Sequence, residues 1–118
     1  MLLVKNGRAA GHRHLITRPV TAIGRADSSD VRLLGPSVSG THATLLLKGE
    51  RWYVVDLDSS NGTFVDGYRI AGERELSDGC VLRTGDVELT FHIVPRLAAG
   101  GQGTRQVIGL RERFEKLW

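Results

Sequence analysis

Short runs of aliphatic, β-branched and aromatic residues alternate with glycine-rich turns along residues 1–94. Eleven glycines divide this stretch, and no segment between them has the period or the length of a crossover helix. The runs lie at residues 2–5, 14–17, 21–23, 30–34, 41–48, 52–57, 63–65, 69–70, 74–76, 81–83 and 88–94. Many short strands separated by turns are typical of an antiparallel sandwich or barrel, so we predict an all-β domain.

Two of these runs predict how the strands are buried. Residues 51–56 alternate between polar and apolar positions, which predicts that Trp52, Val54 and Leu57 share the buried face of one strand. The run Leu45-Leu46-Leu47 is continuous instead, which predicts a central strand covered on both sides.

The composition changes after Pro95. Residues 95–103 are rich in glycine and alanine and predict a flexible linker. Residues 104–118 predict a short amphipathic helix, whose apolar stripe is Val107, Leu110, Phe114, Leu117 and Trp118. An isolated helix of this length needs a surface to lie on. Three alternatives stay open: docking on the chain's own sandwich, pairing with a second copy (a homodimer) or a partner, and occupation of the chain's own site by a phosphorylated Thr104.

The composition is that of a soluble globular chain. Of 118 residues, 41% are hydrophobic and 25% are charged, and a domain of this size needs no disulfide or metal to fold. The single cysteine, Cys80, has no partner for a disulfide, and no Cys/His cluster has zinc-site spacing. Lys5 interrupts the apolar start too early for a signal peptide, and no later run is long enough for a membrane span. We expect a cytoplasmic protein without metal or cofactor.

The net charge of +3 is confined to the tail. Residues 1–94 carry eleven basic and eleven acidic residues, whereas residues 95–118 carry five basic and two acidic residues. A nucleic-acid-binding domain normally presents a basic stripe, and the neutral body has none. The four cations of the predicted helix would attract a membrane surface only weakly. We therefore expect neither a nucleic-acid partner nor a membrane partner.

Three polar clusters interrupt the strand pattern. They are Gly24-Arg25, Ser39-Gly40-Thr41-His42 and Ser59-Ser60-Asn61-Gly62-Thr63, and Asp66-Gly67 follows the third. Each cluster alone has an ordinary structural explanation, since Asn-Gly between two strands is itself a hairpin signal. In this order and spacing, however, they resemble the motif of the forkhead-associated (FHA) domain family, and the resemblance covers residues 2–94. It implies an eleven-strand antiparallel β-sandwich of the FHA/SMAD-like type that binds phosphothreonine peptides through loops at one end.

The side-chain chemistry of these clusters agrees with such a role. A phosphothreonine carries about −1.5 to −2 charges and three strong acceptor oxygens, which suit the planar guanidinium of Arg25. Ser39 and Ser60 add hydroxyl donors, and Gly40 adds a backbone N–H. By resemblance, Asn61 holds the backbone of the extended peptide. The candidate phosphopeptide-binding residues are Arg25, Ser39, Gly40, Thr41, Ser60 and Asn61.

Other motif positions are expected to shape the loops. They are Gly24, His42, Gly62, Asp66 and Gly67. Glycine supplies turn geometry that residues with a Cβ resist, and the resemblance implies that His42 holds Ser39 in place. Two positions depart from the family pattern. Gly40 stands where many members have Arg or Asn, which is expected to weaken phosphate binding. Asp66 replaces the closing asparagine and loses its amide donors, so a bond between loops is expected to be absent or reversed.

Two other classes of function define the alternatives. An enzyme would pair Ser39 with His42 as nucleophile and base, but no acid is placed to orient the histidine and no P-loop pattern occurs, so we expect no catalytic residue. An FHA fold that binds protein partners without phosphate, as an assembly scaffold, stays open. If the chain acts in phosphorylation-dependent signalling or assembly, as the resemblance implies, we expect its partner to be a protein phosphorylated on threonine by a Ser/Thr kinase. The sequence does not determine which residue the domain prefers three places after the phosphothreonine. Arg83 is the candidate cation for an acidic residue at that place.

Overall fold

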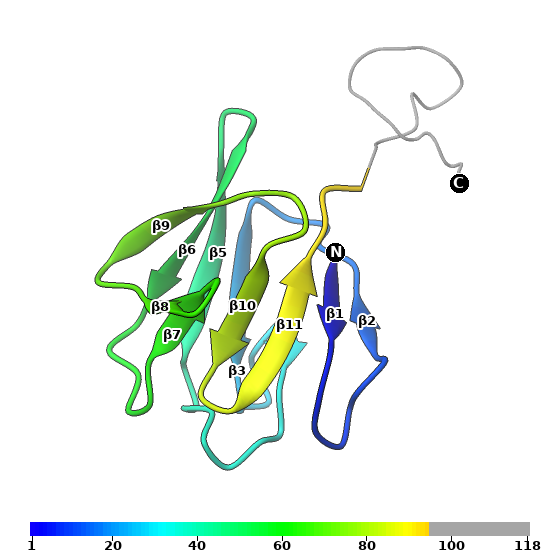
Figure 1. The fold of residues 1–118 in the computed structure, drawn as a ribbon, viewed down its shortest axis with the longest axis vertical. Coiled ribbons are helices and arrows are strands. Elements are labelled where there is room, and N and C mark those ends of the chain that lie inside the picture. The colour runs from blue at the N-terminus through cyan, green and yellow to red at the C-terminus, as the bar shows by residue number, and fades with distance from the viewer. Residues whose placement is uncertain (95–118) are drawn as a thin grey trace.

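The computed structural model describes residues 1–94, which form two β-sheets packed face to face (Figure 1). The strands are β1 (Leu2–Val4), β2 (Arg13–His14), β3 (Val20–Gly24), β4 (Val31–Arg32), β5 (Ala43–Lys48), β6 (Arg51–Asp56), β7 (Thr63–Val65), β8 (Tyr68–Arg69), β9 (Glu73–Leu76), β10 (Val81–Thr84) and β11 (Val87–Phe91). One sheet has the order β2-β1-β11-β10-β7-β8, and the other has the order β4-β3-β5-β6-β9. The predicted eleven-strand β-sandwich is confirmed, with one difference: β3 and β4 pair in parallel, because a loop and not a hairpin joins them.

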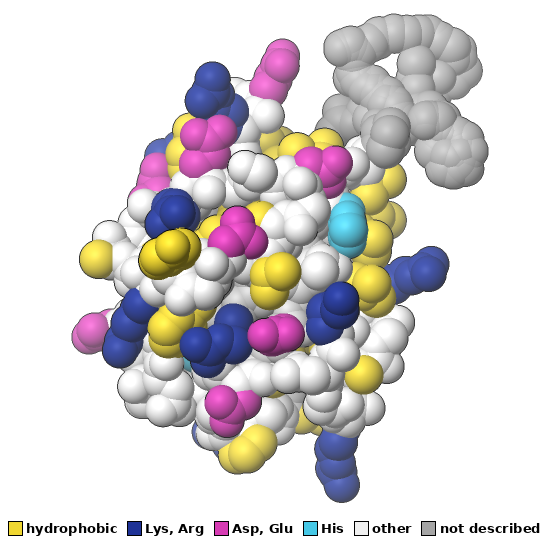
Figure 2. All heavy atoms as spheres, viewed as in Figure 1, with side chains coloured by type: hydrophobic (Ala, Val, Ile, Leu, Met, Phe, Trp, Pro, Cys, Tyr) yellow, Lys and Arg dark blue, Asp and Glu magenta, His cyan; other side chains and the backbone are white. Residues whose placement is uncertain are grey.

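The linker expected at residues 95–103 and the helix expected at 104–118, with its stripe of Val107, Leu110, Phe114, Leu117 and Trp118, lie outside the described residues. Over residues 1–94 every regular element is a strand, and this part of the chain contains no helix of the length and apolarity that a membrane crossing requires. On the face seen in Figure 2, basic and acidic side chains are interspersed. This agrees with the equal numbers of basic and acidic residues in the body of the chain.

The core lies between the two sheets, where alternate side chains of facing strands point inward. Antiparallel pairing sets Leu2 opposite Phe91 and Val4 opposite Leu89, and all four side chains are buried. The second sheet supplies the buried side chains of Ile23, Ala43, Leu45 and Val54. Trp52 of β6 meets Phe91 of β11 edge to face, with ring centroids 6.0 Å apart. An aromatic pair therefore joins the two sheets.

The predicted burial of β5 and β6 is correct only in part. Trp52 packs against the core and Val54 is fully buried, as predicted, but Leu57 is 39% exposed. The alternation stops at Asp56, because the Asp56 carboxylate accepts the backbone N–H of residue 59 and turns the chain out of the strand. Strand β5 is the middle strand of its sheet, yet Leu46 is only half-buried because, within residues 1–94, no further layer covers the outer face of this sheet.

The loops that follow β3, β4 and β6 gather with the β1–β2 and β10–β11 turns at one end of the sandwich, at the bottom of Figure 1. Backbone hydrogen bonds hold these loops together. Arg25 N donates to Ser39 O over 3.0 Å, and Gly85 N donates to Gly62 O over 3.1 Å. The three polar clusters of the sequence therefore meet at this end.

Candidate functional site

A buried imidazole connects two of these loops. His42, fully buried, accepts the backbone N–H of Ser39 at Nδ1 over 3.0 Å, and its Nε2 lies 2.9 Å from the carbonyl oxygen of Gly62. Because a backbone N–H can only donate, Nδ1 carries no proton and Nε2–H donates to Gly62. Both ring nitrogens are thus engaged within the loops, which leaves neither to act as a base toward the Ser39 hydroxyl.

Arg25 lies at the exposed end of β3, just past its last residue, Gly24. Its Nε donates to the backbone carbonyl of Val38 over 3.0 Å, which fixes the guanidinium beside the loop that precedes β5. Within residues 1–94, no hydrogen bond engages the terminal nitrogens of this guanidinium. An anchored guanidinium with a free planar edge is suited to receive two oxygens of an anion.

The side chains of Ser39 and Asn61 meet the same loops. Ser39 Oγ accepts the backbone N–H of Ser60 over 3.1 Å, so the hydroxyl proton of Ser39 stays available to a ligand. Asn61 Nδ2 donates to the carbonyl of Ser37 over 2.8 Å, which leaves the amide oxygen and the second N–H of Asn61 for other partners. The cluster before β5 and the cluster before β7 are therefore in direct contact.

Gly24 and Gly40 mark the closest approach of the loops. A Cβ on Gly24 would lie 2.1 Å from the carbonyl oxygen of Gly40, so no other residue fits at position 24 without separating the loops. Gly40 differs, because it is exposed and a Cβ there would have no atom within 4 Å. Its neighbour Thr41 is exposed on the same rim. Position 40 thus has room for the side chain that many family members carry.

A carboxylate that the sequence reasoning missed holds the loop between β6 and β7. Asp56 accepts hydrogen bonds from the hydroxyls of Ser59, over 2.6 Å, and Thr63, over 2.7 Å. Ser59 Oγ in turn accepts the backbone N–H of Gly62 over 3.0 Å. Burial raises the pKa of Asp56, but the hydrogen bonds from Ser59 and Thr63 outweigh burial and hold this pKa below its usual range. The available signal was the Asp-x-x-Ser spacing of residues 56–59, which favours a side-chain-capped turn.

The Asp66-Gly67 turn joins β7 to β8. Both residues have positive φ, 50° and 87°, as a two-residue turn of the mirror-image type requires. The Asp66 carboxylate accepts the backbone N–H of Val81 over 2.9 Å, and Asp66 N donates to Val81 O over 2.8 Å. The turn is therefore joined to the start of β10, and the loss of the amide donors leaves this contact in place.

Arg83 extends over the outer face of the six-stranded sheet. Its guanidinium carbon lies 3.8 Å from the centre of the Phe64 ring, and its NH1 donates to the carbonyl of Gly85 over 2.7 Å. Arg69 flanks the same region, since a Cβ on Gly62, which has φ +90°, would lie 2.8 Å from Arg69 Nε. The candidate cation is thus held by stacking and by a backbone bond.

This end of the domain can hold an anion and the backbone of an extended peptide. It offers one anchored guanidinium, the Ser39 hydroxyl and the amide of Asn61 within a frame of loops bonded to one another. Among the described residues, no group of three or more His, Cys, Asp or Glu side chains is arranged to hold a metal ion. The chemistry of the arrangement is recognition through hydrogen bonds.

Comparison with known proteins identifies the family. Residues 21–85, more than half of the chain, match the FHA domain family model, so the chain belongs to the FHA domain family. It is 42% identical over 86 residues to the glycogen accumulation regulator GarA of Mycolicibacterium smegmatis, a match that covers 73% of this chain and 50% of GarA. The chain thus spans about half the length of the curated relatives it matches.

Solved structures agree with this assignment. The fold is similar, with a TM-score of 0.72 and 30% identity, to a structure from a structural and functional analysis of phosphothreonine-dependent FHA domain interactions; the match covers 80% of this chain and 95% of that chain. It is also similar to EmbR of Mycobacterium tuberculosis in complex with a low affinity phosphopeptide. That match has a TM-score of 0.72 and 34% identity, and it covers 86% of this chain and 25% of EmbR. The predicted family and fold are confirmed.

The contact between Gly24 and Gly40 predicts unequal tolerance to substitution. We expect Gly24→Ala to lower the free energy of unfolding by about 2–4 kcal/mol, because the added methyl overlaps a backbone carbonyl that cannot rotate away. Gly40→Ala is the control and should change it by less than about 0.5 kcal/mol. Urea unfolding measures both. A Gly24→Ala variant as stable as the Gly40→Ala variant would contradict the close approach of the loops.

The Asp56 network predicts a particular dependence of stability on pH. Because the pKa of Asp56 is lowered in the folded state, its contribution is full above the unfolded value of about 3.9 and is lost as the pH falls through the folded value. We expect Asp56→Asn to cost about 1–2 kcal/mol at pH 6, and this difference should shrink toward pH 2. Asp27→Asn, at an ion pair on the surface, is the control. A difference that stays constant between pH 6 and pH 2 would contradict the role of the Asp56 charge.

Proposed function

We propose that this chain is an interaction module that binds phosphothreonine peptides of a protein phosphorylated by a Ser/Thr kinase. The observation that carries the proposal is the anchoring of Arg25, whose Nε donates to Val38 O while no hydrogen bond within residues 1–94 engages its terminal nitrogens. A guanidinium held in this way loses little rotational freedom when an anion arrives. In this function Arg25 binds two phosphate oxygens.

The other candidate residues divide the remaining work. Ser39 donates its hydroxyl proton to a phosphate oxygen, since its lone pair already accepts Ser60 N–H. The backbone N–H of Gly40 and the hydroxyls of Thr41 and Ser60, which are exposed residues of the same loops, supply further donors to the ligand. Asn61 binds the main chain of the peptide with its amide oxygen and its second N–H, or it releases its hydrogen bond to Ser37 O and binds the peptide with the whole amide group. Recognition thus combines the salt bridge of one guanidinium with hydrogen bonds from uncharged donors.

The relatives support the same ligand class. EmbR binds a phosphopeptide in its solved complex, and another similar structure concerns phosphothreonine-dependent FHA interactions. GarA is described as a regulator, which supports a regulatory and non-enzymatic role. We place this module in the cytoplasm, in agreement with a sequence whose one cysteine, Cys80, is buried and unpaired in the structure.

One observation favours a second function, a scaffold that binds partners without phosphate. Gly40 offers no side chain to the phosphate at a position with open space around it. Asp66 does not add to this alternative, because its carboxylate keeps a bond to β10. The two functions differ in one measurable respect: only phosphate recognition depends on the Arg25 guanidinium.

The first test is therefore Arg25→Ala. Hydrogen bonds to charged groups contribute about 1.5–3 kcal/mol each, so the loss of two should weaken phosphothreonine-peptide binding by about a hundredfold or more. The thermal midpoint should change little, because the side chain is exposed. Arg74→Ala, on the exposed edge strand β9, is the matched control. Isothermal titration with phosphorylated and unphosphorylated peptides measures both variants; equal affinity for the two peptides in the wild type would support the scaffold instead.

The second test places an arginine side chain at position 40, where many family members have Arg or Asn. We expect Gly40→Arg to strengthen binding of a phosphothreonine peptide by about 1 kcal/mol, or about fivefold, since a cation is added where there is room for it. Gly40→Gln, of similar length without charge, should give no such gain. Fluorescence anisotropy with a labelled phosphopeptide distinguishes the two variants. No gain from the arginine would mean that position 40 does not face the phosphate.

A further inference from the structure

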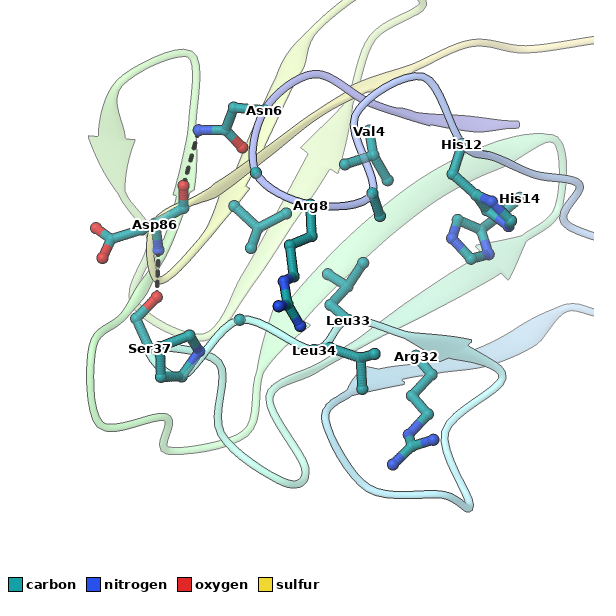
Figure 3. Close-up of a pocket in the computed structure, with 15 residues that line it drawn as sticks. Val4, Asn6, Arg8, His12, His14, Arg32, Leu33, Leu34, Ser37 and Asp86 are labelled. Atoms are coloured by element: carbon teal, nitrogen blue, oxygen red, sulfur yellow. Dashed lines mark hydrogen bonds between the residues drawn. The ribbon is translucent and has the colours of Figure 1, made fainter.

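A cavity lies beside the candidate phosphate site, and none of the six candidate phosphopeptide-binding residues lines it. Its volume is about 840 Å³, and it is enclosed by the β1–β2 loop, the segment that follows β4, and the β10–β11 turn (Figure 3). Pockets of about 300–1,000 Å³ commonly accept a small molecule or a large side chain. The cavity is thus large enough to hold a ligand group of its own.

The walls of this cavity are mainly apolar. They include Val4, Leu33, Leu34, Pro36 and Val87. Val4 and Leu33 belong to the buried core, but Leu34 is 61% exposed. An exposed leucine in a concave apolar surface is a typical feature of a binding site, since covering it removes apolar area from water.

The rim of the cavity is basic. Its charged residues are two arginines, Arg8 and Arg32, and one carboxylate, Asp86. His12 and His14 also line it, but burial and the neighbouring His12 lower the pKa of His14, so the charge of the rim comes from the arginines. In Figure 3, Arg8 reaches from the β1–β2 loop toward Leu34, while the Asp86 carboxylate points away from Arg8. Arg32 pairs with Asp27 over 2.6 Å, whereas Arg8 forms no ion pair within residues 1–94. An apolar floor with a cationic rim complements an apolar group flanked by carboxylates.

The cavity has a preformed wall and touches the candidate phosphate site. Asn6 Nδ2 donates to Asp86 O and its Oδ1 accepts Glu88 N–H, both over 2.9 Å, which fixes the β1–β2 loop to the β10–β11 turn. Ser37 lines the cavity, and its carbonyl accepts Asn61 Nδ2. Arg32 also lines the cavity and donates Nε to the carbonyl of Arg25 over 3.1 Å. A peptide bound at Arg25 and Asn61 would therefore have this cavity as its neighbour.

The charge of the rim favours one of three possible occupants of the cavity: residues 95–118 of this chain, a second copy of the chain, or an acidic segment of a partner. Residues 95–118 of this chain carry five basic and two acidic residues, so their charge has the same sign as the rim. A second copy in a two-fold pairing would set one basic rim against another. We infer that the cavity binds a bulky apolar side chain in an acidic segment, rich in Asp and Glu, of the same polypeptide that carries the phosphothreonine. The last clause of this inference rests on the proposed function; the acidic, apolar ligand class rests on the cavity alone.

The ligand class is tested with a short synthetic peptide of Asp and Glu around a central Leu-Phe pair, titrated into the full chain labelled with ¹⁵N. We expect amide signals of residues 6–9, 32–37 and 86–87 to shift. Leu34→Glu and Arg8→Glu should each weaken binding about fivefold or more, because they place a carboxylate beside those of the peptide. Leu15→Glu, at a leucine 67% exposed and outside the cavity, and Arg74→Glu are the matched controls and should leave binding unchanged.

Three results would overturn the ligand class: no shift at millimolar peptide, shifts confined to residues 24–25, 39–41 and 60–61, or binding of decanoate in the cavity without binding of the peptide. Arg25→Ala separates this inference from the proposed function. It should abolish binding of a phosphothreonine peptide and leave binding of the acidic peptide intact.

A separate measurement tests whether one polypeptide occupies both the candidate phosphate site and the cavity. A phosphothreonine peptide that is extended on one side or the other by the acidic segment should bind about tenfold or more tightly than the core phosphopeptide, because the second contact becomes intramolecular. Leu34→Glu should remove this gain without changing the affinity for the core phosphopeptide. Extended peptides without any gain on either side would overturn the assignment of both sites to one partner.

Discussion

The recognition end of this domain depends on one buried imidazole. His42 joins the loop before β5 to the loop before β7, and the carbonyl of Gly62 that it holds also accepts the N–H of Gly85 from the β10–β11 turn. Without the ring, the N–H of Ser39 would lose its partner and the carbonyl of Gly62 would keep only Gly85 N–H; an unsatisfied polar group in a buried place costs about 1–3 kcal/mol. Three loops without regular structure are therefore held together through one fully buried side chain.

The consequence for binding is that the donors are in place beforehand. Ser39 Oγ is held by Ser60 N–H, the N–H of Gly62 is held by Ser59, and Ser59 is held by Asp56. Each bond restrains a group that would otherwise have to be ordered when the ligand arrives, and ordering a side chain costs about 0.5–1.5 kcal/mol. The Arg25 side chain is exposed, but the hydrogen bond from its Nε to Val38 O restrains it as well. The proposed binding surface is thus held by hydrogen bonds within the domain, and Arg25 is the cation proposed for it.

The sequence predicts the fold well because its strands are short and its turns are marked. All eleven runs correspond to strands, since glycine and Asp-Gly turns separate them and leave little room for other elements. The errors arise where side chains override the pattern. Leu57 follows the alternation of β6, but the carboxylate of Asp56 ends that strand, and periodicity carries no information about a side-chain cap. The parallel pairing of β3 and β4 depends on the path of a loop, which local pattern does not determine.

The candidate site was predictable to a different extent. Residue types and their order point to Arg25, Ser39 and Asn61, but bonds between residues about twenty positions apart, such as that from Ser39 to Ser60, exist only in the folded chain. The cavity beside the candidate phosphate site likewise depends on contacts that exist only in the folded chain. Arg8 and Leu34 are ordinary surface residues in the sequence, and only the pairing of β1 with β11 and the Asn6 contacts bring them to one hollow.

Local placement of charge, and not total charge, distinguishes this domain from a general anion binder. The body is neutral, with basic and acidic residues in equal number, and several cations are already paired with carboxylates on the surface. At an ionic strength of 0.1 M, exposed charges more than about 10 Å apart are largely screened from one another. A polyanion therefore gains little from the surface as a whole. The proposed sites lie where a guanidinium is held by the backbone, as at Arg25, or extends toward an apolar wall, as at Arg8. Such places discriminate by geometry, because an anion must present its oxygens at the distance and angle that the anchored donors allow.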